Sequence, residues 1–230
     1  MTDHEQSRLG IIHLLVWMAC VAFYLGVFKG LLAAIPYLAG RPTITMIPLY
    51  LQGMGSGTAL AGLLLYFARS CRRVPFPTYP GEYLLVALGC AAVLNLAFYW
   101  ALGRAYRHEA DTGDFPLFWW KACYCALLAA KMVVFVAAGV KVKVERWRLL
   151  LLFAPFPIFA GRLNSYVGTG LDPQAFPLLL DGVLVVVLVM DLVQRRRYPW
   201  THWLGAGVQL WFGVCIVVQV VLQWLAIPVR

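Results

Sequence analysis

Residues 9–28 read LGIIHLLVWMACVAFYLGVF and contain no Asp, Glu, Lys or Arg. A helix needs about 20 apolar residues to cross a hydrocarbon core about 30 Å thick, and this run has that length. Residues 1–8 before it are polar. A signal peptide has a shorter apolar region, about 7–15 residues, followed by a cleavage site. The run therefore predicts a retained first transmembrane helix.

Six further apolar segments follow the first. The chain has 230 residues, of which 62% are hydrophobic and 13% are charged. A soluble domain is about 45–50% apolar and about 25% charged, so lipid is the natural solvent for this chain. We expect a single polytopic domain over residues 1–230, an all-α bundle of about seven transmembrane helices. The expected spans lie near residues 10–34, 45–68, 83–103, 116–140, 148–166, 176–194 and 203–227.

The Lys and Arg residues orient these spans, because cytoplasmic loops carry an excess of both. The expected inner loops hold Arg8, Arg69, Arg72, Arg73, Lys141, Lys143, Arg146, Arg148, Arg195, Arg196 and Arg197. The outer side holds Arg41, Arg104, Arg107, Arg162 and Arg230. We therefore expect a cytoplasmic N-terminus and an external C-terminus. Short loops in a compact chain favour a bacterial inner membrane.

The fifth expected span is short and broken. Its apolar part, residues 149–161, contains Pro155 and Pro157. This length favours a re-entrant or broken helix. The charge pattern instead requires a crossing, because residues 195–197 would otherwise lie outside. We expect a kinked or partly unwound crossing, which needs backbone that is buried in protein or lines a wet cavity.

Charged residues inside spans are functional candidates, because they are costly in lipid. Lys131 lies near the middle of the fourth span and must be paired, neutral or beside a wet cavity. Lys29 and Lys121 lie in the outer third of their spans, where long side chains can reach the headgroups. Asp181 lies one turn into the sixth span and needs a partner. Two interpretations of Asp181 remain open, a structural ion pair and a substrate or proton site.

Several of these residues lie at one depth, in the outer half of the membrane. If their faces converge, they form a polar pocket that opens to the outside. Its members would be Lys29, Asn95, Lys121, Arg162, Asn164, Tyr166 and Asp181. At the inner end of the sixth span, Asp191 is expected to pair with Arg195, four residues later.

Motifs for metals, cofactors and nucleophiles are weak in this chain. Gly53, Gly57 and Ala61 are spaced by four, which is typical of closely packed helices. This interpretation is favoured over a serine nucleophile in residues 53–57. No zinc signature or phosphate-binding loop occurs, so no catalytic residue, metal or cofactor is expected. His13 is interpreted as an interfacial residue, the one histidine expected inside the membrane.

Three function classes remain. An accessory or structural component of a membrane assembly fits the sparse polar residues and short loops. A small-solute transporter or channel fits the broken fifth span and the outer polar residues. An intramembrane enzyme would need an acid–base constellation at one depth, and is ranked third. The expected partners are the lipid bilayer and other membrane subunits or a second copy. The net charge of +9 follows from the loop bias, so nucleic acid is not expected.

Overall fold

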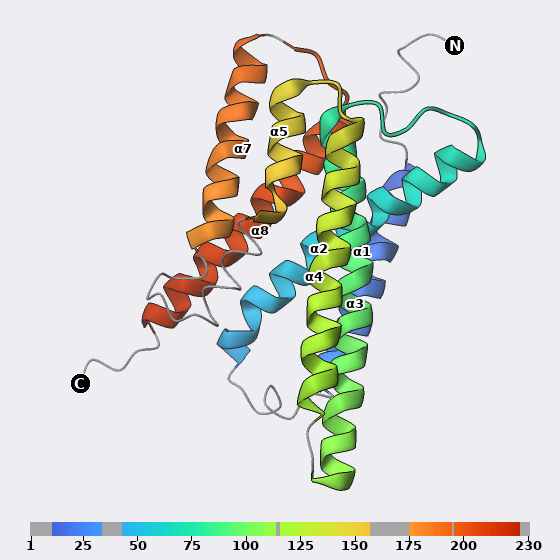
Figure 1. The fold of residues 1–230 in the computed structure, drawn as a ribbon. Helices are drawn as coiled ribbons and strands as arrows, with labels where there is room; N and C mark the ends of the chain where they lie inside the picture. The colour runs from blue at the N-terminus through green and yellow to red at the C-terminus, as the bar shows by residue number, and fades with distance from the viewer. Residues whose placement is uncertain (1–10, 34–42, 114–115, 157–174, 195, 226–230) are drawn as a thin grey trace.

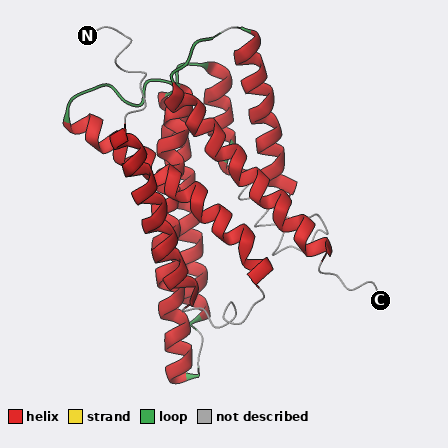
Figure 2. Cartoon of the chain, turned by 180° about the vertical axis from the view of Figure 1, so that it is seen from behind, coloured by secondary structure: helices red, strands yellow, loops and turns green. Residues whose placement is uncertain are grey.

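The computed structural model describes residues 11–33, 43–113, 116–156, 175–194 and 196–225, and the regular elements in these ranges are all helices (Figures 1 and 2). The expected all-α class is confirmed for this part of the chain. The helices are α1 (Ile11–Ala33), α2 (Thr43–Cys71), α3 (Pro80–Thr112), α4 (Leu117–Lys141), α5 (Glu145–Phe153), α7 (Ala175–Val193) and α8 (Trp200–Leu225).

Four of the described helices are long and apolar enough to cross a membrane. The qualifying stretches are His13–Gly30 in α1, Pro80–Thr112 in α3, Phe118–Lys141 in α4 and Trp200–Leu222 in α8. Large apolar side chains are also exposed on the outside of the bundle, for example Phe23, Val140 and Val193. A soluble monomer rarely exposes so much apolar surface. These helices support the expectation of a membrane-embedded protein.

Helix α3 lies at the centre of the bundle and packs against α1, α2, α4, α5 and α8. The larger apolar core surrounds Leu84 and Leu85 and receives side chains from α2, α4, α5, α7 and α8. A smaller core of Tyr24, Phe28 and Ala92 joins α1 to α3. By contrast, α7 contacts α8 and α5 among the described helices. The centre of the bundle is therefore formed around α3 and α8.

Helices α3 and α8 approach each other through glycine. A Cβ added to Gly205 would overlap the carbonyl oxygen of Gly81, and one added to Gly81 would overlap the carbonyl oxygen of His202. The two backbones are thus in direct contact at the first turns of both helices. Such a close approach requires residues without a side chain. This contact brings the N-terminal turns of α3 and α8 together and determines where the polar residues around them lie.

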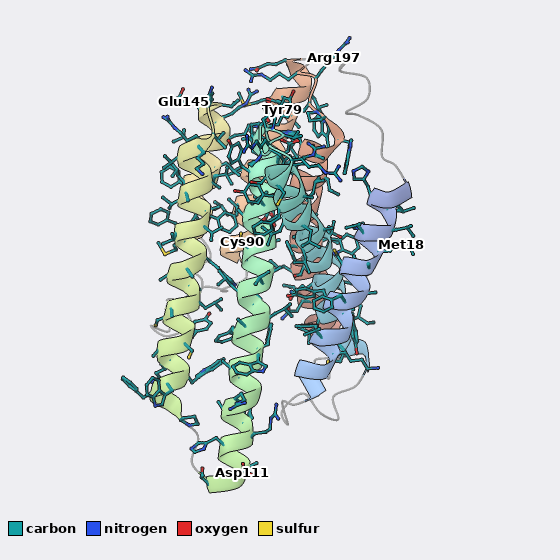
Figure 3. The ribbon with its side chains drawn as sticks, turned by 90° about the vertical axis from the view of Figure 1, so that its right-hand side faces the viewer. Met18, Tyr79, Cys90, Asp111, Glu145 and Arg197 are labelled. Carbon is teal, nitrogen blue, oxygen red and sulfur yellow. The ribbon has the colours of Figure 1, made fainter. Side chains whose placement is uncertain are left out.

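One end of the bundle is strongly basic. The connections from α2 to α3, α4 to α5 and α7 to α8 all lie there, and Figure 3 shows Tyr79, Glu145 and Arg197 at this end and Asp111 at the opposite one. We call it the basic end. Its described cations are Arg69, Arg72, Arg73, Lys141, Lys143, Arg146, Arg148, Arg196 and Arg197. Its described acids are Glu82, Glu145 and Asp191, of which Glu82 and Asp191 are buried.

Helix α3 is longer than the expected span of residues 83–103. The helix continues through the polar residues Arg104 and Glu109 to Thr112, and the next residue, Gly113, caps it with a left-handed φ of 78°. At about 1.5 Å per residue, α3 is about 50 Å long, which exceeds a hydrocarbon core about 30 Å thick. In Figure 1 the α3–α4 hairpin extends beyond the other helices at the end opposite the basic end.

The fifth expected span differs at its start. Helix α5 begins at Glu145 rather than at residue 148, because an acidic residue suits the first turn of a helix and Trp147 is buried in the core. The structure describes the chain after α5 up to Phe156. The rest of that expected span, with Pro157 and the expected kinked crossing, lies outside the described residues.

Candidate functional site

A buried carboxylate joins the N-termini of α3 and α8 at the basic end. Glu82 Oε2 accepts hydrogen bonds from the backbone N–H groups of Thr78 at 2.8 Å and Tyr79 at 3.1 Å. Its Oε1 accepts the hydroxyl of Thr201 on α8. An acidic residue at the third helical position commonly accepts such N–H groups. Negative charge is also favourable at a helix N-terminus. Glu82 therefore stabilises the start of α3 and ties it to α8.

His202 forms a second contact between the same two helices. Its Nδ1 accepts a 2.9 Å hydrogen bond from the backbone N–H of Gly81. Because Nδ1 accepts, the proton of the neutral ring is on Nε2. Nε2 is buried and has no hydrogen-bond partner within the described residues. The ring stacks on Tyr198 at 3.9 Å between centroids and meets Trp147 edge-on at 5.0 Å. His202 is therefore enclosed by aromatic side chains.

Asp191 joins α7 to α5 and is fully buried. Its Oδ1 forms an ion pair with Nη2 of Arg146, and its Oδ2 accepts a 2.8 Å hydrogen bond from Nε1 of Trp147. Arg195, the partner expected from the sequence, lies outside the described residues. A buried carboxylate needs both a counter-charge and hydrogen bonds. Within the described residues, Asp191 obtains its counter-charge and its hydrogen bond from α5. The i, i+4 spacing along α7 did not identify these partners.

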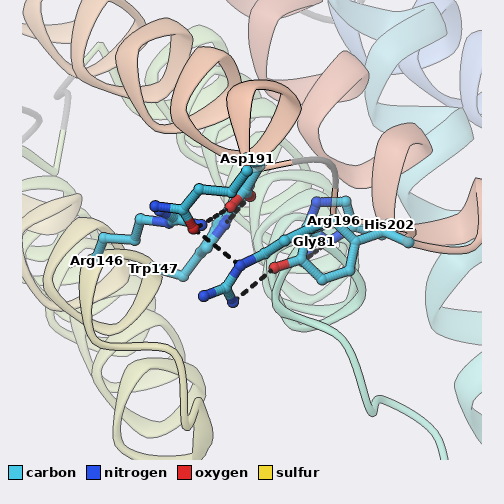
Figure 4. A network of polar contacts seen from close by, with 8 residues as sticks. Gly81, Arg146, Trp147, Asp191, Arg196 and His202 are labelled. Carbon is cyan, nitrogen blue, oxygen red and sulfur yellow. Dashed lines mark hydrogen bonds and ion pairs between the residues drawn. The ribbon is translucent and has the colours of Figure 1, made fainter.

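Figure 4 shows how this network continues to the surface of the basic end. Oε1 of Gln194 accepts hydrogen bonds from Nη2 of Arg146 at 3.0 Å and from Nε of Arg196 at 3.1 Å. Nη1 of Arg196 also lies 3.4 Å from the hydroxyl of Tyr198, whose ring covers His202. The segment between α7 and α8 is thereby attached both to α5 and to the aromatic side chains around His202.

Asp181 lies between α7 and α8, away from the basic end. Its Oδ1 accepts a 2.8 Å hydrogen bond from Nε2 of Gln209. Its Oδ2 is buried without a hydrogen-bond partner among the described residues, and it lies where a Cβ on Gly213 would be. Asp181 as a whole residue is 8% exposed. The structure therefore pairs Asp181 with an amide of the neighbouring helix, and Gly213 provides the space for it.

Lys131 and Asn95 are brought together by α4 and α3. Nζ of Lys131 donates a 2.7 Å hydrogen bond to Oδ1 of Asn95, and both side chains are partly buried. Both residues belong to the set that the sequence singled out. An amide is a reasonable neighbour for a lysine inside a helical bundle, because polar groups in the membrane meet other polar groups or backbone carbonyls. This contact joins the central helix α3 to the peripheral helix α4.

The other members of the expected outer pocket do not join these contacts within the described residues. Lys29 on α1 and Lys121 on α4 are exposed. Among the described residues, helix α7, which carries Asp181, contacts neither α1 nor α4. Arg162, Asn164 and Tyr166 lie outside the described residues. Among the described members, Asn95 and Asp181 lie in two separate interhelical contacts, and Lys29 and Lys121 belong to neither.

Gly53 and Gly57 of α2 face α1. A Cβ on Gly57 would lie 2.6 Å from Cα of Val21, and one on Gly53 would lie 2.7 Å from a methyl carbon of Leu25. Ala61, the third residue of the expected motif, is partly buried. The backbones of α1 and α2 are therefore close at Gly57. The Nε1 group of Trp17 adds a 2.9 Å hydrogen bond to Thr58 at the same interface.

Four interhelical polar pairs summarise this geometry: Glu82–Thr201, Asp191–Arg146, Asp181–Gln209 and Lys131–Asn95. The sequence identified the partner in none of these four pairs. Pro80 and Glu82 are a helix-start signal that could have indicated the role of Glu82. No local signal marks His202, because its burial depends on the contact of α3 with α8.

The chain was compared with protein-family models, with curated proteins and with solved structures, and no match was found in any of the three. The chemistry of the site therefore has to be argued from its own geometry. Among the described residues, no group of three or more His, Cys, Asp and Glu side chains is placed to hold a metal ion. General acid–base catalysis needs a group within reach of a substrate proton. Glu82, Asp191 and His202 are instead engaged with partners inside the bundle.

Proposed function

We propose that this chain is a multi-pass protein of a bacterial inner membrane and acts as a structural or accessory component of a membrane assembly. The observation that supports this most is the use of polar residues. Each of the four interhelical polar pairs joins one helix to another, and the pairs lie at four different helix interfaces, α3–α8, α5–α7, α7–α8 and α3–α4. Polar side chains used in this way give a bundle a defined arrangement of helices.

The proposed topology has seven spans, with the N-terminus and the basic end in the cytoplasm. The gathering of three basic connections at one end of the bundle supports this orientation, since Lys and Arg are retained on the cytoplasmic side. The acids Glu109 and Asp111 would then lie outside, on the part of α3 that extends beyond the hydrocarbon core.

Helix α7 offers a surface for a partner subunit. It contacts α8 and α5 among the described helices, and a stripe of exposed apolar side chains runs along it. The stripe consists of Leu179, Val183, Val186, Met190 and Val193. These residues are spaced by four and three, which is the spacing of a helix–helix seam. Such a stripe would accept a transmembrane helix of another subunit in place of lipid.

Native mass spectrometry of the chain, extracted gently from its own membrane, tests this proposal. We expect a complex that contains a different membrane subunit at a fixed stoichiometry. Replacement of Val186 and Met190 on the α7 stripe by Ala should reduce the fraction in the complex. The matched control replaces Leu15 and Met18, which are exposed on α1. A chain that is found alone, or with copies of itself, contradicts the accessory role.

A second candidate function is transport of a small solute, and one observation favours it. Asp181 has a buried carboxyl oxygen without a hydrogen-bond partner among the described residues. Buried ionisable groups in membrane proteins often mark substrate or ion pathways. In this case Asp181→Asn and Lys131→Met would each abolish solute flux in reconstituted vesicles while the protein remained folded. Solute flux equal to that of the unaltered chain in both variants would exclude a transport role for Asp181 and Lys131.

A further inference from the structure

Two guanidinium groups converge at the basic end. Nη2 of Arg146 and Nε of Arg196 donate to the same oxygen, Oε1 of Gln194, at 3.0 and 3.1 Å. The two nitrogens are therefore no more than about 6 Å apart, a distance at which like charges repel unless an anion is close. Figure 4 shows the Arg146 side chain, which comes from α5, and the Arg196 side chain, which comes from the segment before α8.

Among the described residues around the two guanidinium groups, negative charge does not balance both cations. Asp191 pairs with Arg146, but it is fully buried and also accepts the Trp147 indole. The side-chain partners of Arg196 in the described part of the chain are the neutral groups of Gln194 and Tyr198. Arg196 is exposed, so its remaining N–H groups face the surroundings of the bundle. Nε of Arg146 is buried and has no hydrogen-bond partner within the described residues.

The position of the two arginines indicates which kind of anion would bind between them. The pair lies at the end of the bundle, level with the starts of α5 and α8, where the headgroups of a surrounding bilayer would be. Guanidinium groups donate planar, paired hydrogen bonds that match phosphate oxygens. Basic pockets between helices on the cytoplasmic side bind anionic lipid headgroups. Both the charge and the geometry fit a phosphate group.

We propose that Arg146 and Arg196 form a binding site for the phosphate of an anionic phospholipid. Gln194 holds the two guanidinium groups side by side, and the hydroxyl of Tyr198 orients Arg196. This site is independent of the accessory role, because it concerns the lipid around the chain rather than a protein partner.

The variant Arg196→Gln tests the site with little risk to the fold, because Arg196 is exposed and its described side-chain partners are neutral. Arg72→Gln is the matched control, since Arg72 is also an exposed arginine of the basic end but lies in the connection from α2 to α3. Delipidated full-length protein is titrated with phosphatidylglycerol in mixed micelles, and the thermal midpoint is followed. Phosphatidylcholine and inorganic phosphate are titrated in parallel.

We expect phosphatidylglycerol to raise the midpoint of the unaltered chain and of Arg72→Gln equally, and phosphatidylcholine to have a smaller effect. Arg196→Gln should bind phosphatidylglycerol about tenfold more weakly, since it loses one charged, paired contact. An equal loss in both variants would show that the attraction is a general property of the basic end and would overturn the site. An equal effect of inorganic phosphate would overturn the assignment to a lipid. Full binding by Arg196→Gln would overturn both.

Discussion

The imidazole of His202 accepts a 2.9 Å hydrogen bond from the backbone N–H of Gly81, so a side chain of α8 caps the N-terminus of α3. The first N–H groups of a helix have no partner within the helix. In most helices the residue before the first turn supplies the acceptor. In this chain the acceptor for the N–H of Gly81 is a histidine 121 residues further along the sequence, and Glu82 accepts the N–H groups of Thr78 and Tyr79 just before the helix. Packing against α8 therefore stabilises the start of α3.

Replacement of His202 by Phe should destabilise the protein, because the buried N–H of Gly81 would lose its acceptor while the ring volume is kept. A buried donor left without a partner costs about 1–3 kcal/mol. The measurement is the free energy of unfolding by SDS in mixed micelles, followed by tryptophan fluorescence. His108→Phe is the control, since His108 is exposed near the far end of α3. Equal stability of the two variants would contradict the capping role.

Replacement of Gly205 by Ala should separate α3 from α8. The added methyl group would overlap the carbonyl oxygen of Gly81, and backbone cannot move away as a flexible side chain can. We expect a loss of about 1–3 kcal/mol, the usual cost of overpacking. Gly207→Ala on the same helix has nothing within 4 Å of the new methyl group and should be neutral or stabilising by up to about 1 kcal/mol. The thermal midpoints of both variants provide the comparison. The reverse order of stability would refute the close backbone contact.

Replacement of Asp191 by Asn should leave the guanidinium group of Arg146 without its counter-charge. Loss of one partner from a buried pair costs about 3–5 kcal/mol. The side chain of Arg146 is 18% exposed, so we expect the lower end of this range. Glu145→Gln removes an exposed acid from the neighbouring position and should change stability by less than about 0.5 kcal/mol. SDS unfolding measures both. If Asp191→Asn leaves the free energy of unfolding unchanged, the α5–α7 contact is contradicted.

Labelling of Cys71 tests the proposed orientation. This cysteine is exposed at the end of α2, next to Arg72 at the basic end. A maleimide that does not cross membranes should label the chain in inside-out vesicles and not in intact cells, because the basic end is proposed to face the cytoplasm. Cys71→Ser, which should lose this labelling, corrects for the other cysteines. Labelling of Cys71 in intact cells would reverse the topology.

The sequence predicted the positions of most helices correctly. The observed bounds of α1, α2, α4, α7 and α8 lie within a single helical turn of the expected spans. Helix α3 exceeds its expected span, because hydropathy marks the part of a helix that lies in lipid and not the polar turns that continue it. Hydropathy also could not place Glu145 and Arg146 in α5, because charged residues at the end of an apolar run are assigned to the loop.

The partners of the polar residues were harder to predict. Depth along a span can be read from sequence, but the direction of each side chain depends on how the helices pack. Lys29 and Asp181 were expected at one depth, yet α1 and α7 do not contact each other within the described residues. Gln209, the observed partner of Asp181, lies 28 residues away on α8. Such a pair follows from the tertiary arrangement rather than from any local pattern.

The central claim is that the polar residues inside the bundle hold helices together, and Asp181 with Gln209 tests it most directly. The free energies of unfolding of Asp181→Ala, Gln209→Ala and the double variant form a double-mutant cycle. A structural pair predicts a favourable coupling of about 0.6–1.7 kcal/mol, the range of hydrogen bonds between transmembrane helices. Gly207→Ala combined with Asp181→Ala, with no coupling expected, is the control. A coupling of zero between Asp181 and Gln209 in folded variants would contradict the account.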